Sequence, residues 1–371
     1  MTGKAPVPVM LTIRHMNMGG AQRQLFNLAT GLDPRRFRPL VVCLHREEPL
    51  MKRLRESGVE TLCVPARHSI DPGLPVRLAR VARDRGVRLL HSYLFAANAW
   101  GRIAARLAGI PAVASERTDR PRRRRREILA ERVLAPLTAA YIVNSEAVAR
   151  RVLQAVPAMR GRLRRIPNGI DLTPFAGDRH RCRADLRVLL RLPADATLAG
   201  VLGTLSPDKA HGILLDALSG LPPTVGLVVM GEGPERRALE DRIRAGGLSE
   251  RVHLLGHRDD VPGLLLGLDL LVQSSLREGM PNAVLEGMAA GLPVVATAVG
   301  GTAEALGGGD CGVLVEPGSA AALAEAMAAL LADPGRAAAL AARARERVEI
   351  EYSLAGMIRR TEALYAEILQ A

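Results

Sequence analysis

The stretch of residues 274–306 constrains the fold most strongly, because patterns typical of a helix start, a helix stop and a strand follow one another within it. Pro281 and Asn282 are typical of a helix start, since proline fixes the helical φ and asparagine caps free backbone amides. Gly291 provides a left-handed stop after about Ala290. The pattern therefore predicts a short helix between Pro281 and Ala290.

A buried strand and a second helix start follow in the same stretch. Val294–Thr297 is a short apolar run, as expected for a strand of a parallel sheet that is covered on both faces. Gly300 and Gly301 then predict a turn, and Thr302 begins another helix. Helix N-termini present unpaired amides and a positive dipole end, which suit a diphosphate. We therefore expect two such N-termini near one edge of a sheet.

Two carboxylates accompany these turns. Glu278 precedes the first helix and Glu286 lies one turn inside it, so both are expected to face one cleft and to accept hydrogen bonds from sugar hydroxyls. Each of them alone fits an ordinary helix-surface carboxylate. Together with the glycine turns, their spacing predicts a nucleotide-sugar site.

The alternation of strand, turn and helix recurs along the chain and predicts an α/β protein built on doubly wound parallel sheets. At 371 residues the chain exceeds one ordinary core, so two domains are expected. The other strands are predicted at Val7–Ile13, Pro39–Leu44, Thr61–Val64, Arg88–His91, Ala112–Ser115, Ala140–Val143, from Ala199, at Val225–Met230 and at Val252–Leu255. Long helices are predicted at Ala320–Ala332, Arg336–Ile350 and Ser353–Leu369, and a boundary loop at Gly177–Arg191.

Several motifs together resemble a known family. The strings EGMPNAVLE, GLPVVAT and GG-x-x-E within residues 274–306, and PNGID-x3-F at residues 167–175, closely resemble the retaining glycosyltransferases of family 4, which have the two-domain GT-B fold. The resemblance implies two Rossmann-like domains that face a central cleft. We expect an N-terminal, acceptor-binding domain over residues 1–178, a nucleotide-sugar domain over residues 179–352, and a C-terminal helix over residues 353–371 that crosses back to the first domain.

The resemblance also implies roles for residues of the second domain. Glu278 would bind hydroxyls of the donor sugar, Glu286 would bind the ribose, and Lys209 would hold the donor diphosphate. Family members usually carry an arginine where this chain has Thr204, whose hydroxyl can donate a hydrogen bond but brings no charge. The further donor-binding residues implied are Gly231, His257, Arg258, Asn282, Ala283, Val284 and Thr302.

In the first domain, the resemblance assigns the acceptor side of the cleft. Gly19 and Gly20 would let the backbone approach the donor and acceptor, and His91 would have a catalytic role at a strand end. Many family members have His-x-His at that strand end, and Tyr93 replaces the second histidine here. A histidine or a glycine turn at such a position is also compatible with a purely structural role.

Charge and composition limit the partners. The net charge is +13, but nearly all basic residues are arginine, so only local clustering indicates an anionic partner. Aromatic residues are only 2% of the chain, which argues against nucleic-acid stacking, and no nucleic-acid partner is expected. The one dense basic cluster precedes an amphipathic segment of the kind that lies on anionic lipid, although a solvated charge run explains it nearly as well. The cluster consists of Arg120, Arg122, Arg123, Arg124, Arg125 and Arg126, followed by Ile128, Leu129, Val133, Leu134 and Leu137.

The sequence predicts neither a cofactor nor a metal site. Asp259 and Asp260 are expected to cap the following helix rather than to bind a metal, and the donor is expected to be a UDP- or GDP-sugar. The four cysteines stand far apart, as in a reduced cytoplasmic protein. No apolar run is long enough to span a bilayer, so a cytoplasmic location is expected. Peripheral contact with the inner face of the membrane is compatible with this expectation.

The function predicted from these features is transfer of a hexose from a nucleoside-diphosphate sugar to a saccharide or lipid-linked saccharide in cell-surface polysaccharide or glycolipid synthesis. Two alternatives remain open. A GT-B epimerase or phosphorylase would convert its substrate without a saccharide acceptor. A non-catalytic protein would use the fold and the arginine cluster to bind membrane or nucleic acid.

Overall fold

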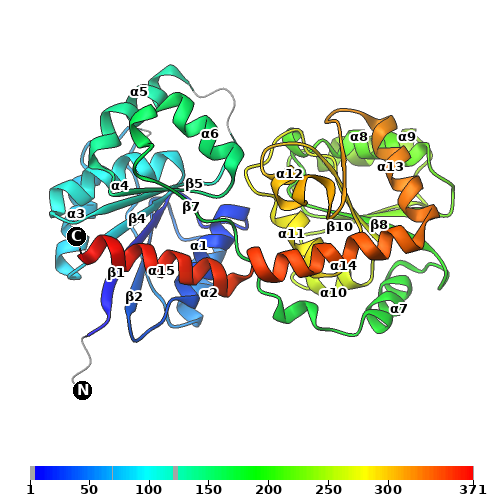
Figure 1. Ribbon diagram of the computed structural model, residues 1–371, viewed down its shortest axis with the longest axis horizontal. Coiled ribbons are helices and arrows are strands. Elements are labelled where there is room, and N and C mark those ends of the chain that lie inside the picture. The colour runs from blue at the N-terminus through cyan, green and yellow to red at the C-terminus, as the bar shows by residue number, and fades with distance from the viewer. Residues whose placement is uncertain (1–4, 69, 120–123, 371) are drawn as a thin grey trace. The chain divides into compact units, whose positions relative to one another are not determined.

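The computed structural model describes residues 5–68, 70–119 and 124–370. Its chain forms two compact units, each built on its own parallel sheet (Figure 1). The first unit runs to Gly169 and also includes the chain from Leu354 onward, and the second unit is Ile170–Ser353. The segment between Ile170 and the predicted boundary at residue 178 thus belongs to the second unit.

The first unit is a doubly wound domain. Its sheet has seven parallel strands in the order β3-β2-β1-β4-β5-β6-β7. One face packs against α1, α2 and α15, and the other packs against α3, α4 and α6. The strands are β1 (Val7–Ile13), β2 (Phe37–Cys43), β3 (Glu60–Cys63), β4 (Leu89–Tyr93), β5 (Ala112–Glu116), β6 (Ala140–Val143) and β7 (Leu163–Arg165). The helices are α1 (Gly20–Gly31), α2 (Pro49–Glu56), α3 (Leu74–Asp84), α4 (Leu94–Ala108), α5 (Arg125–Leu134), α6 (Glu146–Ala155) and α15 (Leu354–Gln370), with 3-10 turns η1 (Ala135–Leu137) and η2 (Pro157–Met159).

The second unit repeats this design with six parallel strands in the order β10-β9-β8-β11-β12-β13. Helices α7, α10, α11 and α14 cover one face of the sheet, and α8, α9 and α13 cover the other. The strands are β8 (Thr197–Leu202), β9 (Val225–Met230), β10 (Val252–Gly256), β11 (Leu270–Gln273), β12 (Val294–Thr297) and β13 (Val313–Val315). The helices are α7 (Arg179–Leu190), α8 (His211–Ser219), α9 (Arg236–Ala245), α10 (Val261–Leu266), α11 (Asn282–Ala289), α12 (Thr302–Ala305), α13 (Ala320–Ala332) and α14 (Pro334–Glu351), with 3-10 turns η3 (Thr173–Phe175), η4 (Pro207–Lys209) and η5 (Gly307–Gly309).

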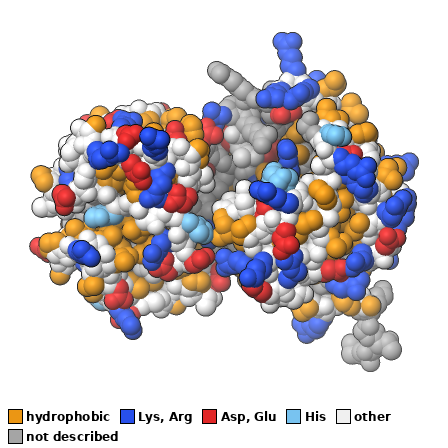
Figure 2. All heavy atoms as spheres, turned by 180° about the vertical axis from the view of Figure 1, so that it is seen from behind, with side chains coloured by type: hydrophobic (Ala, Val, Ile, Leu, Met, Phe, Trp, Pro, Cys, Tyr) orange, Lys and Arg blue, Asp and Glu red, His pale blue; other side chains and the backbone are white. Residues whose placement is uncertain are grey.

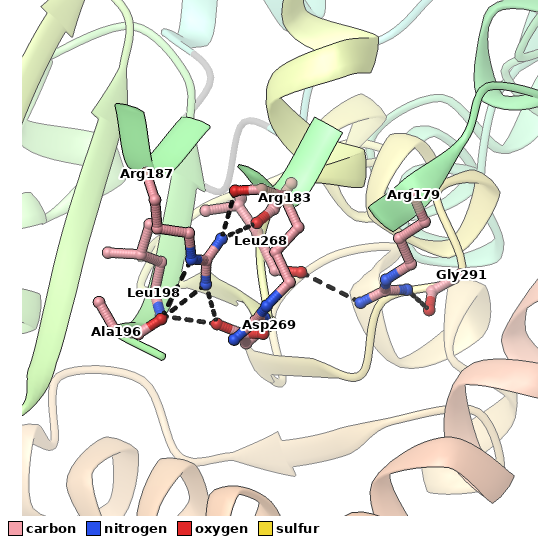
Figure 3. A network of polar contacts seen from close by, with 9 residues as sticks. Arg179, Arg183, Arg187, Ala196, Leu198, Leu268, Asp269 and Gly291 are labelled. Atoms are coloured by element: carbon pink, nitrogen blue, oxygen red, sulfur yellow. Dashed lines mark hydrogen bonds and ion pairs between the residues drawn. The ribbon is translucent and has the colours of Figure 1, made fainter. Parts of the chain in front are cut away.

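Residues 179–190, which were predicted as part of a boundary loop, instead form helix α7. Asp178 caps this helix by accepting hydrogen bonds from the amides of His180 and Arg181. Its arginines fold back onto the second unit (Figure 3). Arg179 donates to the carbonyls of Gly291 and Leu268, at 2.8 and 3.0 Å. The prediction failed because these arginines bind backbone carbonyls inside the unit instead of extending into solvent.

Basic side chains are spread widely over the surface. Figure 2 shows lysine and arginine side chains mixed with acidic ones over the face that it displays. On that face, the mixture fits a generally basic surface. Among the described helices, none combines the length and the apolar character that crossing a bilayer requires.

Candidate functional site

The carboxyl ends of β8 and β11 lie at the point where the strand order of the second sheet reverses. β8 and β11 are neighbours in the sheet, although β9 and β10 lie between them along the chain. In open parallel sheets, ligands bind in the crevice beyond the strand ends at this switch point. The loop after β8 carries Lys209, and the loop after β11 carries Glu278. The fold therefore brings two of the predicted donor-site residues to the position where a ligand is expected.

Lys209 and Glu278 form an ion pair at this point. The Nζ atom of Lys209 lies 2.5 Å from Oε1 of Glu278, and the two side chains are 27% and 9% exposed. The same Oε1 atom also accepts hydrogen bonds from Gln273 Nε2 at 2.8 Å and Ser275 Oγ at 2.7 Å. Charge-assisted contacts of this kind hold a side chain in one geometry. Glu278 is thus a pre-positioned, nearly buried carboxylate beside a lysine that keeps some access to solvent.

Further polar groups hold the loops around this pair. Ser274 Oγ donates to the carbonyl of Lys209 at 2.9 Å, and Thr297 Oγ1 donates to the carbonyl of Ser275 at 2.5 Å. Thr302 Oγ1 lies 3.4 Å from Oε1 of Gln273, which links the predicted Thr302 to the cluster through Gln273 rather than directly. The loops after β8, β11 and β12 are therefore joined into one hydrogen-bonded rim.

Gly300 packs closely against the backbone of Glu278. Gly300 has a φ of +53°, and a Cβ atom there would lie 1.7 Å from the carbonyl oxygen of Glu278. Only glycine fits such a contact, because the backbone oxygen cannot move away as a flexible side chain would. Gly301 adds a backbone hydrogen bond to the carbonyl of Gly279 at 2.9 Å. The predicted glycine turn thus serves to position the Glu278 loop.

Helix α11 begins at Asn282, so its N-cap differs from the predicted one. Pro281 occupies the N-cap with extended dihedral angles, and Asn282 is the first helical residue, so Asn282 does not have the predicted capping position. Asn282 and Ala283 are half-buried, whereas Val284 is fully buried in the core. The side chain of Val284 therefore packs in the core, and only its backbone remains available to a ligand. Glu286 lies on the same helix and is 3% exposed, so its side chain is less accessible than expected for a residue that binds a ribose.

The other predicted donor residues lie on the same sheet edge but outside this cluster. Thr204 is exposed in the loop after β8. Gly231 packs so closely on the neighbouring loop that a Cβ atom would lie 1.9 Å from the carbonyl oxygen of Gly203. The structure thus gives Gly231 a packing role between two loops of the unit.

His257 and Arg258 follow β10, two strands away from β8. Arg258 forms a two-pronged pair with Asp260, with N···O distances of 2.8 and 2.6 Å. Asp260 occupies the N-cap of α10, as predicted, but its side chain makes no capping hydrogen bond and binds Arg258 instead. A base contact of His257 or Arg258 stays a prediction.

The backbone next to Lys209 adopts an unfavourable conformation. Ala210 has a φ of +50°, and Leu94, directly after β4 at the switch point of the first sheet, has a φ of +67°. Left-handed conformations of non-glycine residues cost roughly 1–2 kcal/mol each and persist where the surroundings enforce them. Strained residues of this kind cluster at functional sites, so their presence at both switch points indicates functional loops.

His211 follows this strained residue and is 2% exposed. Burial, with the nearby charge of Lys209, lowers the pKa of His211 to about 4. The unfolded chain takes up a proton on His211 below its ordinary pKa near 6.5, and the folded chain does so only near pH 4. This histidine therefore makes the second unit less stable as the pH falls from 6.5 towards 4.

We expect His211→Leu to remove part of this acid sensitivity. For the wild-type chain, His211 alone lowers the free energy of unfolding by about 2 kcal/mol between pH 7 and pH 5. Urea unfolding followed by circular dichroism at the two pH values measures that difference for wild type and variant. His257→Leu, at an exposed histidine of the same unit, is the control. An unchanged pH dependence in His211→Leu contradicts the prediction.

In the first unit, the glycine turn after β1 has the predicted location. Gly19 is the N-cap of α1 and Gly20 is its first residue. Gly19 has a φ of −95°, so it is not required for a left-handed turn, and the nearest atoms to a Cβ there belong to the side chains of Gln22 and Asn17. The turn lies at the switch point of the first sheet, and its role in binding a ligand stays a prediction.

His91 lies in the core of the first unit. Its Nδ1 atom is 2.6 Å from the hydroxyl of Tyr365 on α15, and its Nε2 atom is 2.7 Å from Oγ of Ser115. The side chain is fully buried, and burial, aided by Arg117, holds the pKa of His91 well below its usual range. A neutral histidine with both ring nitrogens engaged and no exposed surface does not fit the predicted catalytic contact. The structure assigns it instead to joining α15, β4 and β5.

Two sequence models of known families match the chain. The model of "Glycosyltransferase Family 4" matches residues 18–174, and that of "Glycosyl transferases group 1" matches residues 183–347. The chain belongs to the group 1 glycosyltransferases. The two models between them cover both structural units, which confirms the family recognised from the sequence motifs.

Curated relatives are about 30% identical to the chain over the aligned part of their sequences. A D-inositol 3-phosphate glycosyltransferase from Salinispora arenicola is 31% identical over 257 residues, which cover 62% of this chain and 57% of the relative. The match thus spans little more than half the length of that relative. A UDP-Gal:alpha-D-GlcNAc-diphosphoundecaprenol alpha-1,3-galactosyltransferase from Escherichia coli is 29% identical over 266 residues, 67% of each chain.

Solved structures share the whole fold. HepE from Anabaena in complex with UDP has a TM-score of 0.88 at 24% identity, covering 97% of this chain and all of the other. WaaG, a glycosyltransferase involved in lipopolysaccharide biosynthesis, has a TM-score of 0.73 at 19% identity, covering 96% and 99% of the two chains. These likenesses confirm the predicted GT-B fold.

Sequence reasoning missed two residues of the candidate site, Gln273 and Ser275. Both bind Glu278, and they lie at the end of β11, where an apolar strand changes abruptly into the polar run Gln-Ser-Ser. A polar run directly after a buried strand marks the carboxyl edge of a parallel sheet, where ligands bind. That change of polarity would have identified both residues.

Proposed function

We propose that the chain is a retaining glycosyltransferase that moves a hexose from a nucleoside-diphosphate sugar to a saccharide or lipid-linked saccharide acceptor. The observation that carries this proposal is the Lys209–Glu278 pair at the switch point of the second sheet, with Gln273 and Ser275 holding the carboxylate. Membership of the group 1 glycosyltransferases supports it.

The chemistry needs positioning and charge stabilisation rather than a protein nucleophile. The bond from the anomeric carbon to the diphosphate oxygen breaks, a bond to the acceptor oxygen forms on the same face of the sugar, and the acceptor proton passes to the departing diphosphate. Lys209 stabilises the charge that develops on that diphosphate, together with amides of the first turn of α11. Glu278 accepts hydrogen bonds from sugar hydroxyls and holds the anomeric carbon next to the acceptor oxygen. In this proposal, no step requires a metal ion.

A UDP-sugar is the donor that we propose first. HepE was solved with UDP-glucose, at a TM-score of 0.86 and 25% identity, and the E. coli relative is described as using UDP-Gal. Glu286 would bind the ribose after a local opening of α11, since it is buried in the structure described here. The proposed location is cytoplasmic, where nucleotide sugars are made.

A thermal-shift screen of UDP-, GDP- and ADP-sugars tests the donor. A ligand at a hundredfold excess over its Kd stabilises the folded state by about 2.7 kcal/mol, which raises Tm by several degrees. Lys209→Ala should lose this shift, and Lys52→Ala, at an exposed lysine of the first unit, should keep it. Absence of a shift with all three donor classes contradicts the proposal.

Product analysis separates transfer from the alternatives. Incubation with the stabilising donor and a panel of saccharide acceptors should give a product with the donor's anomeric configuration, as read by NMR. An epimerase or phosphorylase would instead convert the donor without a saccharide acceptor. A conversion of that kind, or inversion at the anomeric carbon, would overturn the retaining-transferase assignment.

We further propose that α5 contacts an anionic membrane surface, which suits a lipid-linked acceptor. Leu129 and Val133 on this helix are 64% and 67% exposed, although both are apolar. Exposed arginines, Arg124, Arg125 and Arg126, stand at its start. Arg120, Arg122 and Arg123 of the predicted cluster lie outside the described residues. An exposed apolar pair beside basic side chains is the composition of an interfacial helix.

Co-sedimentation with phosphatidylglycerol vesicles tests this contact. We expect binding that weakens with salt, and a loss of roughly tenfold or more in the double variant Leu129→Ser/Val133→Ser, because it removes the two side chains that would enter the lipid. Val188→Ser, at a side chain of the second unit that is 78% exposed, is the matched control. Equal loss in both variants, or no binding by the wild type, contradicts the proposal.

A further inference from the structure

A cluster of metal-binding side chains lies in the first unit, apart from the residues that the proposed transfer uses. His15, His45 and Glu48 each offer one ligand atom, and these three atoms lie within 4.8 Å of one another. Sequence reasoning did not find the cluster, since the residues have no zinc-motif spacing. The parallel register of β1 and β2 brings them together.

The fold explains how this set arises. In the sheet, Ile13 of β1 pairs with Cys43 of β2, so the residues two positions further along each strand direction, His15 and His45, leave the sheet side by side. Their rings stand 4.5 Å apart between centroids, at an angle of 56°. Glu48 precedes α2 and turns its carboxylate back towards both rings.

The distances fit a shared ion. Nδ1 of His15 and Nδ1 of His45 lie 3.1 and 3.6 Å from the same carboxylate oxygen, Oε1 of Glu48. Ligand bonds of about 2.0–2.1 Å in tetrahedral geometry place ligand atoms about 3.3 Å apart. The two separations, 3.1 and 3.6 Å, bracket this value.

One atom of the cluster lacks a conventional partner. Nδ1 of His45 is shielded from solvent and has no hydrogen-bond acceptor or donor among the described residues. Its 3.6 Å separation from Glu48 is too long for a hydrogen bond. A bound cation between the two groups would satisfy this nitrogen, which a simple histidine–glutamate pair does not.

We propose that His15, His45 and Glu48 bind one divalent transition-metal ion of the Zn²⁺ class. Imidazole nitrogens with one carboxylate select such ions, whereas Mg²⁺ and Ca²⁺ require oxygen ligands. The His15 and His45 side chains are 35% and 43% exposed, so an ion can enter from solvent. Three protein ligands leave at least one coordination position open to water or to an oxygen of a bound molecule.

The ion would also fix the loop that leads to Gly19. The second oxygen of Glu48, Oε2, accepts a hydrogen bond from the amide of Met16, and the amide of Leu50 donates to the carbonyl of Met16 at 3.2 Å. Glu48 would therefore hold the metal with one oxygen and the backbone after β1 with the other. Metal binding thus stiffens the glycine turn at the switch point of the first sheet.

Metal titration of the full-length chain, freed of affinity tag and treated with chelator, tests the site. We expect one Zn²⁺ per chain by calorimetry, visible d–d bands of tetrahedral or five-coordinate Co²⁺, a rise in Tm with Zn²⁺, and none of these with Mg²⁺. His15→Ala and His45→Ala should each weaken Zn²⁺ binding by at least about tenfold. His68→Ala, at an exposed histidine of the same unit, should not change it.

A second substitution keeps the test decisive if an alanine variant does not fold. Glu48→Gln retains the shape and the hydrogen bond to the loop but removes the negative charge, so it should weaken Zn²⁺ and leave the far-UV spectrum unchanged. The proposal is overturned if the wild type binds no Zn²⁺, or if all three variants bind it as tightly as wild type.

Discussion

Replacing Glu278 by glutamine should reduce sugar transfer on the order of 10²–10³-fold while leaving the fold intact. Glutamine keeps an oxygen that accepts the hydrogen bonds from Lys209, Gln273 and Ser275, so the loop should hold its shape. It loses the negative charge that orients sugar hydroxyls and balances Lys209. Initial rates with saturating donor and acceptor, beside urea unfolding curves of the same samples, measure both effects.

The comparison of activity with stability distinguishes a substrate-binding carboxylate from a structural one. If Glu278 served only to neutralise Lys209, Glu278→Gln would lower stability and activity together, and Lys209→Met in the same chain would restore both. A site role predicts instead that Lys209→Met and Glu278→Gln each remove most of the activity and that the double variant restores none. Glu349→Gln, at an exposed, ion-paired glutamate of the same unit, provides the control and should retain full activity.

The elements that the sequence predicts well are those bounded by strong local patterns. β1, β6, β9, β12 and α13 have the predicted bounds, because uninterrupted apolar runs or alanine-rich segments end there at glycine, proline or polar residues. The short strands β7, β11 and β13 were not predicted, since so few residues carry little periodicity. They exist because a neighbouring strand supplies their hydrogen bonds.

The candidate site was only partly predictable, for a related reason. Lys209 and Glu278 were recognised from motifs, but their mutual contact depends on β8 and β11 being neighbours in the sheet. Pattern analysis sees each loop separately. The same limit explains His91, because the sequence places it correctly at a strand end and cannot show that Tyr365, far along the chain, covers it.

Arginine has two opposite roles in this chain, and the sequence does not separate them. Arg124, Arg125 and Arg126 are exposed at the start of α5, whereas Arg187 in α7 is 2% exposed. A polar pattern predicts solvent exposure for both groups. Burial of an arginine is favourable only where carbonyls and a carboxylate meet all sides of its guanidinium, which is a property of the assembled unit.

Replacing Arg187 by leucine should therefore lower the free energy of unfolding of the second unit by about 4 kcal/mol. The guanidinium donates to the carbonyls of Ala196 and Gly267 and lies 2.6 Å from Oδ2 of Asp269 (Figure 3). Burial, with Arg183 nearby, lowers the pKa of Arg187 to about 10, so it stays charged at neutral pH. Leucine fills part of the volume but removes a donor from the two carbonyls and from Asp269, which keeps the Leu198 amide on Oδ2 and Arg183 on its other oxygen.

Arg183→Leu is the matched control, because Arg183 pairs with the same Asp269 from a side chain that is 35% exposed. Partly exposed ion pairs contribute about 0–1 kcal/mol, so this variant should unfold close to wild type. The single tryptophan, Trp100, lies in α4 of the first unit, so its fluorescence follows that unit while circular dichroism follows both. We expect Arg187→Leu to shift the dichroism transition to lower urea and to leave the fluorescence transition in place. A loss no larger than that of Arg183→Leu would mean that water replaces the guanidinium, and that α7 is held by its apolar contacts instead.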